Sequence, residues 1–167
     1  MPDLSEGFRL VPAGEIEGVV YRVCPARYRE NVVSMRGSYT HGARYNIKGY
    51  FGALCVSISV ETARREAERY STIRPKGGFV EAAIELRLNR VIDLTKPSLL
   101  RRIVIGLEQL TKVNHSIPQE IGLSAWETGI QALMVPSAAD RGKRNLAVFL
   151  DNQRPIWRVE LRKLAEH

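Results

Sequence analysis

The chain has 167 residues, of which 44% are hydrophobic and 26% charged, an ordinary globular composition that argues against a disordered chain. The length favours a single domain covering residues 1–167. Lys and Arg number 25 against 18 Asp and Glu, and the net charge of +7 suits an anionic partner, whether nucleic acid, an acidic protein or a phosphate-bearing ligand.

The first half of the chain predicts two strands, a long polar segment between them, and a helix. A run rich in β-branched residues at 19–24 predicts a strand that ends at Pro25. Residues 25–50 are polar and contain several glycines, which is typical of a functional loop. A buried strand is expected at 54–58, followed by a helix from Ser59, its N-cap, to about residue 70.

The second half predicts further short strands and two further helices. Gly77-Gly78 indicates a turn before this region. The expected strands are 79–88, 91–94, 146–150 and 156–164, and the expected helices are 97–112 and 124–134. Short strands among three helices, without a regular strand–helix–strand order, indicate an α+β fold rather than a doubly wound sheet.

Several classes of protein and site are not supported by the sequence. No apolar run approaches the roughly 20 residues of a membrane-spanning helix, and the first residues lack the pattern of a signal peptide. Cys24 and Cys55 are therefore expected to be reduced thiols in a cytoplasmic protein. Cys and His are too few and too scattered for a zinc site, so no metal is expected.

The segment 42–49, GARYNIKG, has the composition of a ligand-binding loop. Glycines at both ends allow close approach of the backbone to a ligand, and Arg44 offers a planar fork of donors. The segment contains neither G-x-G-x-x-G nor a Walker A sequence, so a conventional nucleotide-binding fold is not indicated.

Glu66 is expected on the inward face of the predicted helix, beside Ala63, Ala67 and Tyr70. Neighbouring charges are expected on other faces, paired four residues apart as Glu61–Arg65 and Arg64–Glu68. A carboxylate on a buried face needs either an ion-pair partner or a chemical role. The helical pattern alone leaves both readings open.

Two other polar residues have an ordinary and a functional reading. Ser137 follows Pro136 at the end of an apolar segment, where a serine is usually a turn or capping residue. The sequence has no G-x-S-x-G, so a hydrolase triad is not indicated. Arg22 lies in the first predicted strand, where an arginine is either solvated or available as a cation at the edge of a site.

Taken in order along the chain, these pieces resemble the RES domain family, which is named for an arginine, a glutamate and a serine. The matching segments are Tyr21-Arg22, Gly42–Gly49, Ala63-Arg64-Arg65-Glu66, Pro136-Ser137 and Asn145. The resemblance covers about residues 20–152. One position departs from it, because Cys55 stands where the family commonly has a tyrosine, which puts stacking by that ring in doubt.

The resemblance implies an α+β fold similar to ADP-ribosyltransferases of the diphtheria-toxin type, with short strands around a central NAD cleft. It also implies a toxin of a type II toxin–antitoxin module that uses NAD as its substrate. Its partner would be an antitoxin with an Xre-like helix-turn-helix domain, and the two proteins would form an assembly. No direct nucleic-acid or membrane contact of this chain is implied.

The resemblance also assigns roles that suit the chemistry of the residues. Glu66 would stabilise the positive charge that develops on the ribose when the nicotinamide bond breaks. Arg22 and Arg44 would bind the pyrophosphate. The expected catalytic residues are Glu66, Arg44 and Ser137, and the expected NAD-binding residues are Arg22, Gly42, Arg44, Tyr45, Asn46, Cys55, Ser137 and Asn145.

Three functions follow from this reading. The first is an NAD glycohydrolase, and the second is a protein ADP-ribosyltransferase that uses NAD on the same fold. The third is a non-catalytic nucleic-acid-binding module. The sequence disfavours the third, because the basic residues are spread along the chain and no RNP-like or helix-turn-helix signature is present.

Overall fold

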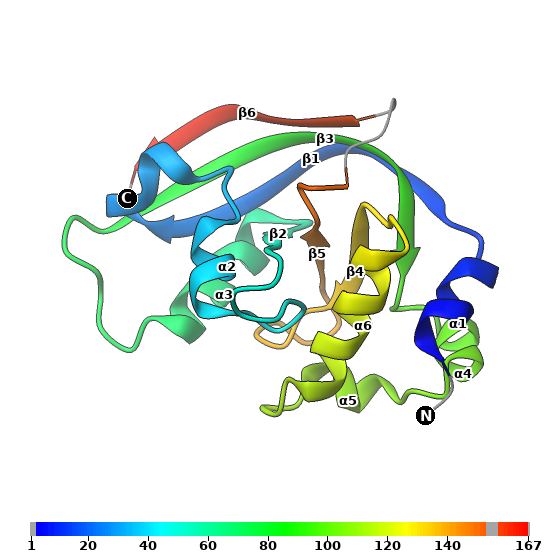
Figure 1. Ribbon diagram of the computed structural model, residues 1–167. Helices are drawn as coiled ribbons and strands as arrows, with labels where there is room; N and C mark the ends of the chain where they lie inside the picture. Colours follow the sequence, from blue (N-terminus) through cyan, green and yellow to red (C-terminus); the bar gives the residue numbers. More distant parts are fainter. Residues whose placement is uncertain (1–2, 153–156, 167) are drawn as a thin grey trace.

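The computed structural model describes residues 3–152 and 157–166, in which six strands form one sheet (Figure 1). The strands are β1 (Gly14–Pro25), β2 (Leu54–Ser57), β3 (Phe79–Asp93), β4 (Ala132–Pro136), β5 (Arg144–Val148) and β6 (Trp157–Glu166). The helices are α1 (Leu4–Leu10), the 3₁₀ helix η1 (Ala26–Asn31), α2 (Arg36–His41), α3 (Val60–Tyr70), α4 (Pro97–Arg102), α5 (Leu107–Thr111) and α6 (Ser116–Glu127). The mixed α/β class expected from the sequence is confirmed.

The strand pairings close the sheet on itself. The order is β1-β2-β5-β4-β3-β6, and β1 also pairs with β3 along most of its length, from Gly14 opposite Val91 to Pro25 opposite Phe79. Strands β1, β2, β5, β4 and β3 therefore form a ring, and β6 extends the sheet from the other edge of β3. Ring closure removes most of the free edges that an open sheet would leave.

One pair of strands is parallel, and its connection carries three helices. Residues 91–93 of β3 pair in parallel with residues 132–134 of β4, whereas the other pairings of the sheet are antiparallel. A parallel pair needs a long crossover, and α4, α5 and α6 lie within it. The sequence predicted no regular strand–helix–strand order, and this crossover is a single strand–helix–strand connection in an otherwise antiparallel sheet.

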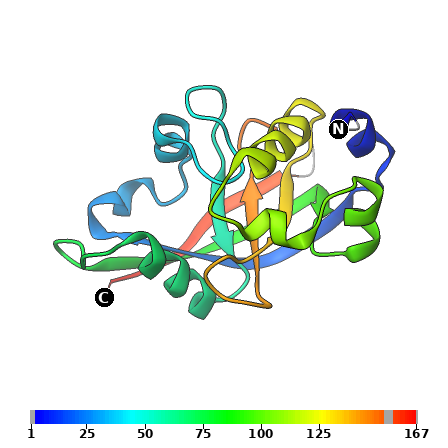
Figure 2. The same ribbon diagram turned by 90° about the horizontal axis from the view of Figure 1, so that it is seen from below.

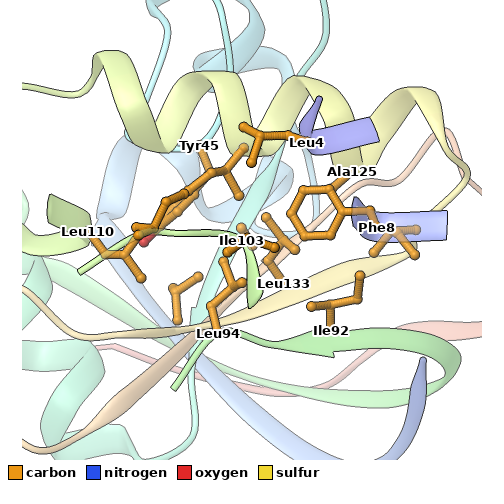
Figure 3. Close-up of a cluster of buried hydrophobic side chains, with 14 of the residues drawn as sticks. Leu4, Phe8, Tyr45, Ile92, Leu94, Ile103, Leu110, Ala125 and Leu133 are labelled. Carbon is orange, nitrogen blue, oxygen red and sulfur yellow. The ribbon is translucent and has the colours of Figure 1, made fainter. Parts of the chain in front are cut away.

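The helices cover a hydrophobic cluster on one side of the sheet. Figure 3 shows side chains from α1, α4–α6 and the sheet meeting there. The labelled members are Leu4, Phe8, Tyr45, Ile92, Leu94, Ile103, Leu110, Ala125 and Leu133. A second cluster is formed within the sheet, where the alternating residues Val80, Ala82, Ile84, Leu86 and Leu88 of β3 are buried as their period-2 pattern predicts.

Several predicted boundaries differ from the structure. The expected strands 79–88 and 91–94 are one continuous strand, β3. The expected helix 124–134 is wrong: α6 ends at Glu127, Gly129 has a left-handed φ of 75°, and the following apolar run forms β4. A short apolar run fits a buried strand or a buried helix equally well, and only the glycine separates the two. The predicted loop 25–50 contains η1 and α2.

The expected helix 97–112 is broken between α4 and α5. Val104 lies in this break with a φ of 57°, and its side chain is 71% exposed. A β-branched residue in the left-handed region is strained by its Cβ. Leu99, Ile103 and Leu110 of the predicted apolar stripe are still buried in the core. The apolar pattern therefore identified the buried residues correctly, although the helix is not continuous.

We expect Val104→Asn to raise the free energy of unfolding by about 1 kcal/mol, because asparagine tolerates the left-handed region better than valine does. Urea unfolding followed by circular dichroism measures the change. Val113→Asn is the matched control, because Val113 is also exposed and has no positive φ. An equal gain in both variants would show that relief of backbone strain is not the cause.

Candidate active site

A cavity of about 550 Å³ lies where β1, β2, β5, α3 and the 42–49 segment meet. Figure 2 shows β2, β5 and β4 side by side, with α3 near one end of these strands and α6 near the other. The cavity is within the range of 300–1,000 Å³ that is common for small-molecule sites. Arg22, Arg44, Glu66 and Asn145 are among the residues that line it.

Helix α3 delivers Glu66 to this cavity. It starts as predicted at Ser59, whose hydroxyl accepts a hydrogen bond from the backbone N–H of Thr62 at 3.2 Å. Thr62 and Ala63 are buried on the inward face, whereas Tyr70, expected on that face, is 65% exposed. The last turn of α3 therefore leaves the core, and Tyr70 lines the mouth of the cavity instead.

The predicted pairing of charges along α3 is not what the structure shows. Arg64 forms an ion pair with Glu81 of β3, and Arg65 with Asp140 at 2.7 Å. Both arginines thus anchor α3 to other elements rather than to neighbours on the same helix. Opposite charges at i, i+4 stabilise a helix only weakly. Arg64 and Arg65 instead form ion pairs with residues outside the helix, Glu81 and Asp140.

Neutral donors, not a cation, hold the Glu66 carboxylate. Its Oε1 accepts a hydrogen bond from the Ser137 hydroxyl at 2.5 Å and another from the Asn145 side-chain amide at 2.7 Å. Within residues 3–152 and 157–166, no ion pair of Glu66 with Lys or Arg is present. The ion-pair reading of Glu66 is therefore not supported, and two neutral side chains hold the carboxylate beside the cavity.

Ser137 and Asn145 reach Glu66 from two neighbouring strands. Ser137 directly follows β4, and Asn145 lies near the start of β5. The Ser137 side chain is buried, and its hydroxyl donates its hydrogen to Glu66. The structure thus brings the glutamate and the serine of the sequence motif together, while direct contact of Ser137 with a ligand stays a prediction.

The two motif arginines line the cavity and also hold loops. Nη1 of Arg44 donates to the carbonyls of Leu110 at 3.3 Å and Lys112 at 2.5 Å. Nη1 of Arg22 donates to the carbonyls of Val32 at 2.8 Å and Ser34 at 3.2 Å. A guanidinium has five N–H donors, so each side chain has further donors with which to bind an anion. Pyrophosphate binding by either one stays a prediction.

The rest of the 42–49 segment is mainly structural. Gly42 and Gly49 have left-handed φ values of 77° and 72°, as the turn requires. Asn46 is fully buried, and its side-chain amide donates to the carbonyls of Ser38 at 2.8 Å and Phe51 at 3.0 Å. It does not line the cavity. The structure shows Asn46 in the framework of the loop, and its predicted contact with NAD stays a prediction.

Tyr45 and Cys55 also line the cavity. Tyr45 packs into the cluster of Figure 3, and its burial raises the pKa of the phenol despite the opposing effect of Arg44. Cys55 on β2 lines the cavity and has an exposed side chain. Burial raises the pKa of the Cys55 thiol, and the Arg22 charge opposes this rise. A raised pKa keeps Cys55 in the neutral thiol form.

Three site residues on or next to α6 were missed by the sequence analysis. The Gln119 amide donates to the carbonyls of Ala43 at 3.1 Å and Asn46 at 3.3 Å, which fixes the 42–49 segment. A Cβ on Gly122 would lie 1.8 Å from the Tyr45 carbonyl oxygen, so only glycine allows this approach. His115 lines the cavity, and burial with the nearby Arg44 charge lowers its pKa. The predicted helix began at residue 124, whereas α6 begins at Ser116, so these three residues were not recognised as part of a helix or its start.

Among residues 3–152 and 157–166, no group of three or more His, Cys, Asp or Glu side chains has the geometry of a metal site. In the same residues, no helix is both long and apolar enough to cross a bilayer.

The family is settled by comparison with known proteins. The model of the RES domain matches residues 19–164, which is most of the chain. The chain belongs to the RES domain family. The match includes the positions of Arg22, Arg44, Glu66, Ser137 and Asn145.

Solved structures give an independent view of the fold. The chain is similar to a chain of the crystal structure of the M. tuberculosis MbcT–MbcA toxin–antitoxin complex, with a TM-score of 0.85 and 21% sequence identity. The similarity covers 100% of this chain and 93% of that one. At this identity the likeness shows that the fold is shared. The search of curated proteins found no match.

We expect Gly122→Ala to lower the free energy of unfolding by about 1–3 kcal/mol, because the added methyl group meets the Tyr45 carbonyl and must displace the loop or the helix. Thermal unfolding measures the effect. Gly37→Ala is the control, because Gly37 also lies in a helix and a Cβ there meets nothing within 4 Å. Equal stability of the two variants would contradict the close packing of α6 on this loop.

Proposed function

We propose that this RES domain is an enzyme that cleaves the nicotinamide–ribose bond of NAD, on a fold of the ADP-ribosyltransferase type. The observation that carries the proposal is the Glu66 carboxylate, held by two neutral donors in the wall of a cavity that two arginines also line. A charged group beside a cavity with no cationic partner suits a reaction in which positive charge develops.

The proposed reaction has a simple balance of bonds. The bond between C1′ of the ribose and the nicotinamide nitrogen breaks, and its electron pair leaves with nicotinamide. The ribose becomes oxocarbenium-like, and water adds to C1′ and loses a proton, which gives ADP-ribose. In this proposal the Glu66 carboxylate would stabilise the cationic ribose and orient the water, as in glycoside hydrolysis. Arg44 and Arg22 would bind the pyrophosphate through donors that the loop carbonyls do not use.

The same site is suited to a second reaction. If a side chain of another protein replaces water as the nucleophile, the product is an ADP-ribosylated protein. Labelled NAD separates the two, because hydrolysis gives free ADP-ribose and transfer gives labelled protein. Steeply salt-dependent binding to DNA without NAD turnover would instead favour the nucleic-acid-binding function.

Glu66→Gln should lower the single-turnover rate of NAD cleavage by about 100-fold or more while the affinity for NAD changes little, because the charge is needed mainly in the transition state. Release of nicotinamide measures the rate. Glu68→Gln on the exposed face of the same helix is the matched control and should keep full activity. A fully active Glu66→Gln variant would remove Glu66 from the mechanism.

Arg44 should act mainly in binding, because the pyrophosphate carries its charge before and during the reaction. Arg44→Lys keeps one positive charge and loses the fork, so KM should rise about tenfold for each 1.4 kcal/mol of binding lost, with a smaller effect on kcat. The change to lysine is preferred to alanine because Arg44 also holds the carbonyls of Leu110 and Lys112.

We further propose that the chain is the toxin of a toxin–antitoxin module and acts in the cytoplasm. Support comes from the RES family and from the likeness in fold to a chain of a toxin–antitoxin complex. Its partner would be an antitoxin with an Xre-like helix-turn-helix domain. The net charge of +7 favours an acidic partner surface over the cavity.

Expression of the chain without its partner is expected to lower cellular NAD and stop growth, because an unblocked enzyme would consume the NAD pool. Cell density and NAD content are measured together after induction. Cells that make Glu66→Gln at the same level should grow normally. Normal growth and normal NAD in cells that contain soluble wild-type protein would contradict the role as a toxin.

A further inference from the structure

Each of the two donors to Glu66 is itself fixed from the side away from the carboxylate. This feature rests on residues that the family motif does not contain, Ser57 on β2 and Asp140 in the turn between β4 and β5. Both residues are buried. Their role is tied to the proposed function, because Glu66 is the group that they would serve.

The first support runs through Ser57. Ser57 lies opposite Asn145 in the antiparallel register of β2 and β5, and its hydroxyl donates to Oδ1 of Asn145 at 2.7 Å. A carboxylate only accepts hydrogen bonds, so Asn145 must face Glu66 with its NH₂ group and turn Oδ1 away. Ser57 supplies the donor for that oxygen. Without Ser57, the amide loses the bond that opposes its rotation.

The second support runs through Asp140. Its carboxylate accepts hydrogen bonds from Thr62 Oγ1 at 2.9 Å and from Arg65 Nη1 at 2.7 Å. Thr62 and Arg65 both belong to α3, the helix that carries Glu66. Asp140 therefore ties the turn that holds Ser137 to the same helix, so that the serine and the glutamate are fixed relative to each other.

The backbone of this turn also decides where the Ser137 hydrogen points. The N–H of Asp140 donates to Ser137 Oγ at 2.9 Å, and the N–H of Ala139 donates at 3.3 Å. A hydroxyl has one hydrogen and two acceptor sites. Because both sites receive backbone donors, the single hydrogen is left for Glu66 Oε1.

We propose that Ser57 and Asp140 are positioning residues for Glu66. Together they keep Asn145 and Ser137 as donors to Oε1, and Oε2 is then the oxygen that Glu66 presents to the reacting ribose. A carboxylate that is fixed in this way meets the developing charge without first rotating, which is the benefit of preorganisation in catalysis. Substitution of Ser57 or Asp140 should therefore slow the chemical step more than it weakens ligand binding.

Ser57→Ala and Asp140→Asn are the test variants, with NAD cleavage measured in single turnover and ADP-ribose binding measured by calorimetry. Each is expected to lower the rate at least about tenfold, while the Kd for ADP-ribose changes less than about twofold. Thr128→Val is the matched control, because it removes a partly buried hydroxyl that donates to carbonyls of α6 and lies outside the Glu66 network. Test variants that lose stability but keep the wild-type rate per folded molecule would overturn the proposal.

A readout independent of activity follows the Asn145 side-chain amide by ¹H–¹⁵N NMR. In the wild type, its two hydrogens should be distinct and slow to exchange. Ser57→Ala and Glu66→Gln should each shift these resonances and speed their exchange, and Thr128→Val should not. Unchanged Asn145 resonances in Ser57→Ala would overturn the proposal.

The two measurements keep the failure of this inference separate from that of the proposed function. A wild-type protein that leaves NAD intact would defeat the proposed enzyme, and the NMR experiment would still decide whether Ser57 orients Asn145. Turnover by the wild type with unchanged rates in Ser57→Ala and Asp140→Asn would defeat the positioning role and leave the enzyme standing.

Discussion

The hydrogen bonds that converge on Glu66 Oε1 are the constraint on which the rest of the site depends. They join three segments that are distant in sequence, namely α3 through Glu66, the end of β4 through Ser137, and β5 through Asn145. A half-buried carboxylate loses solvation, and hydrogen bonds from neutral donors compensate for part of that loss without neutralising its charge. An arginine in their place would have cancelled the charge, and its own desolvation would have added a further cost.

The closed sheet makes this convergence possible. Asn145 pairs with Ser57 on one side and with Val135 on the other, so the register of three strands sets its position. A slip of one residue between β2 and β5 would turn Asn145 to the opposite face of the sheet. The buried alternation of β2 and β5 in the second core cluster opposes such a slip. The packing of the core thus determines the geometry of a polar site that lies outside it.

The local part of this arrangement was predictable from sequence, and the long-range part was not. Ser59 as N-cap, α3 and β2 follow from capping and apolar pattern over a few residues. The ordered motif identified Glu66, Ser137 and Asn145, which do meet. Ser57, Gln119 and Asp140 were not found, because a serine in a strand, a glutamine in a helix and an aspartate in a turn look ordinary until the tertiary pairing is known.

In the 42–49 segment, most residues of the motif hold the loop in shape, and this framework in turn sets the position of Arg44, the residue proposed to bind a ligand. Its glycines and Asn46 form the turn, Gln119 of α6 holds its carbonyls, and Gly122 lets the helix approach it. These contacts order a loop that would otherwise lose conformational entropy each time a ligand bound. Arg44 projects from this ordered frame, and its guanidinium is fixed by hydrogen bonds to the carbonyls of Leu110 and Lys112. The structural residues of the motif thus act on Arg44 indirectly, because they hold the loop from which it projects in one conformation, and a proposed anion would meet a guanidinium that is already oriented.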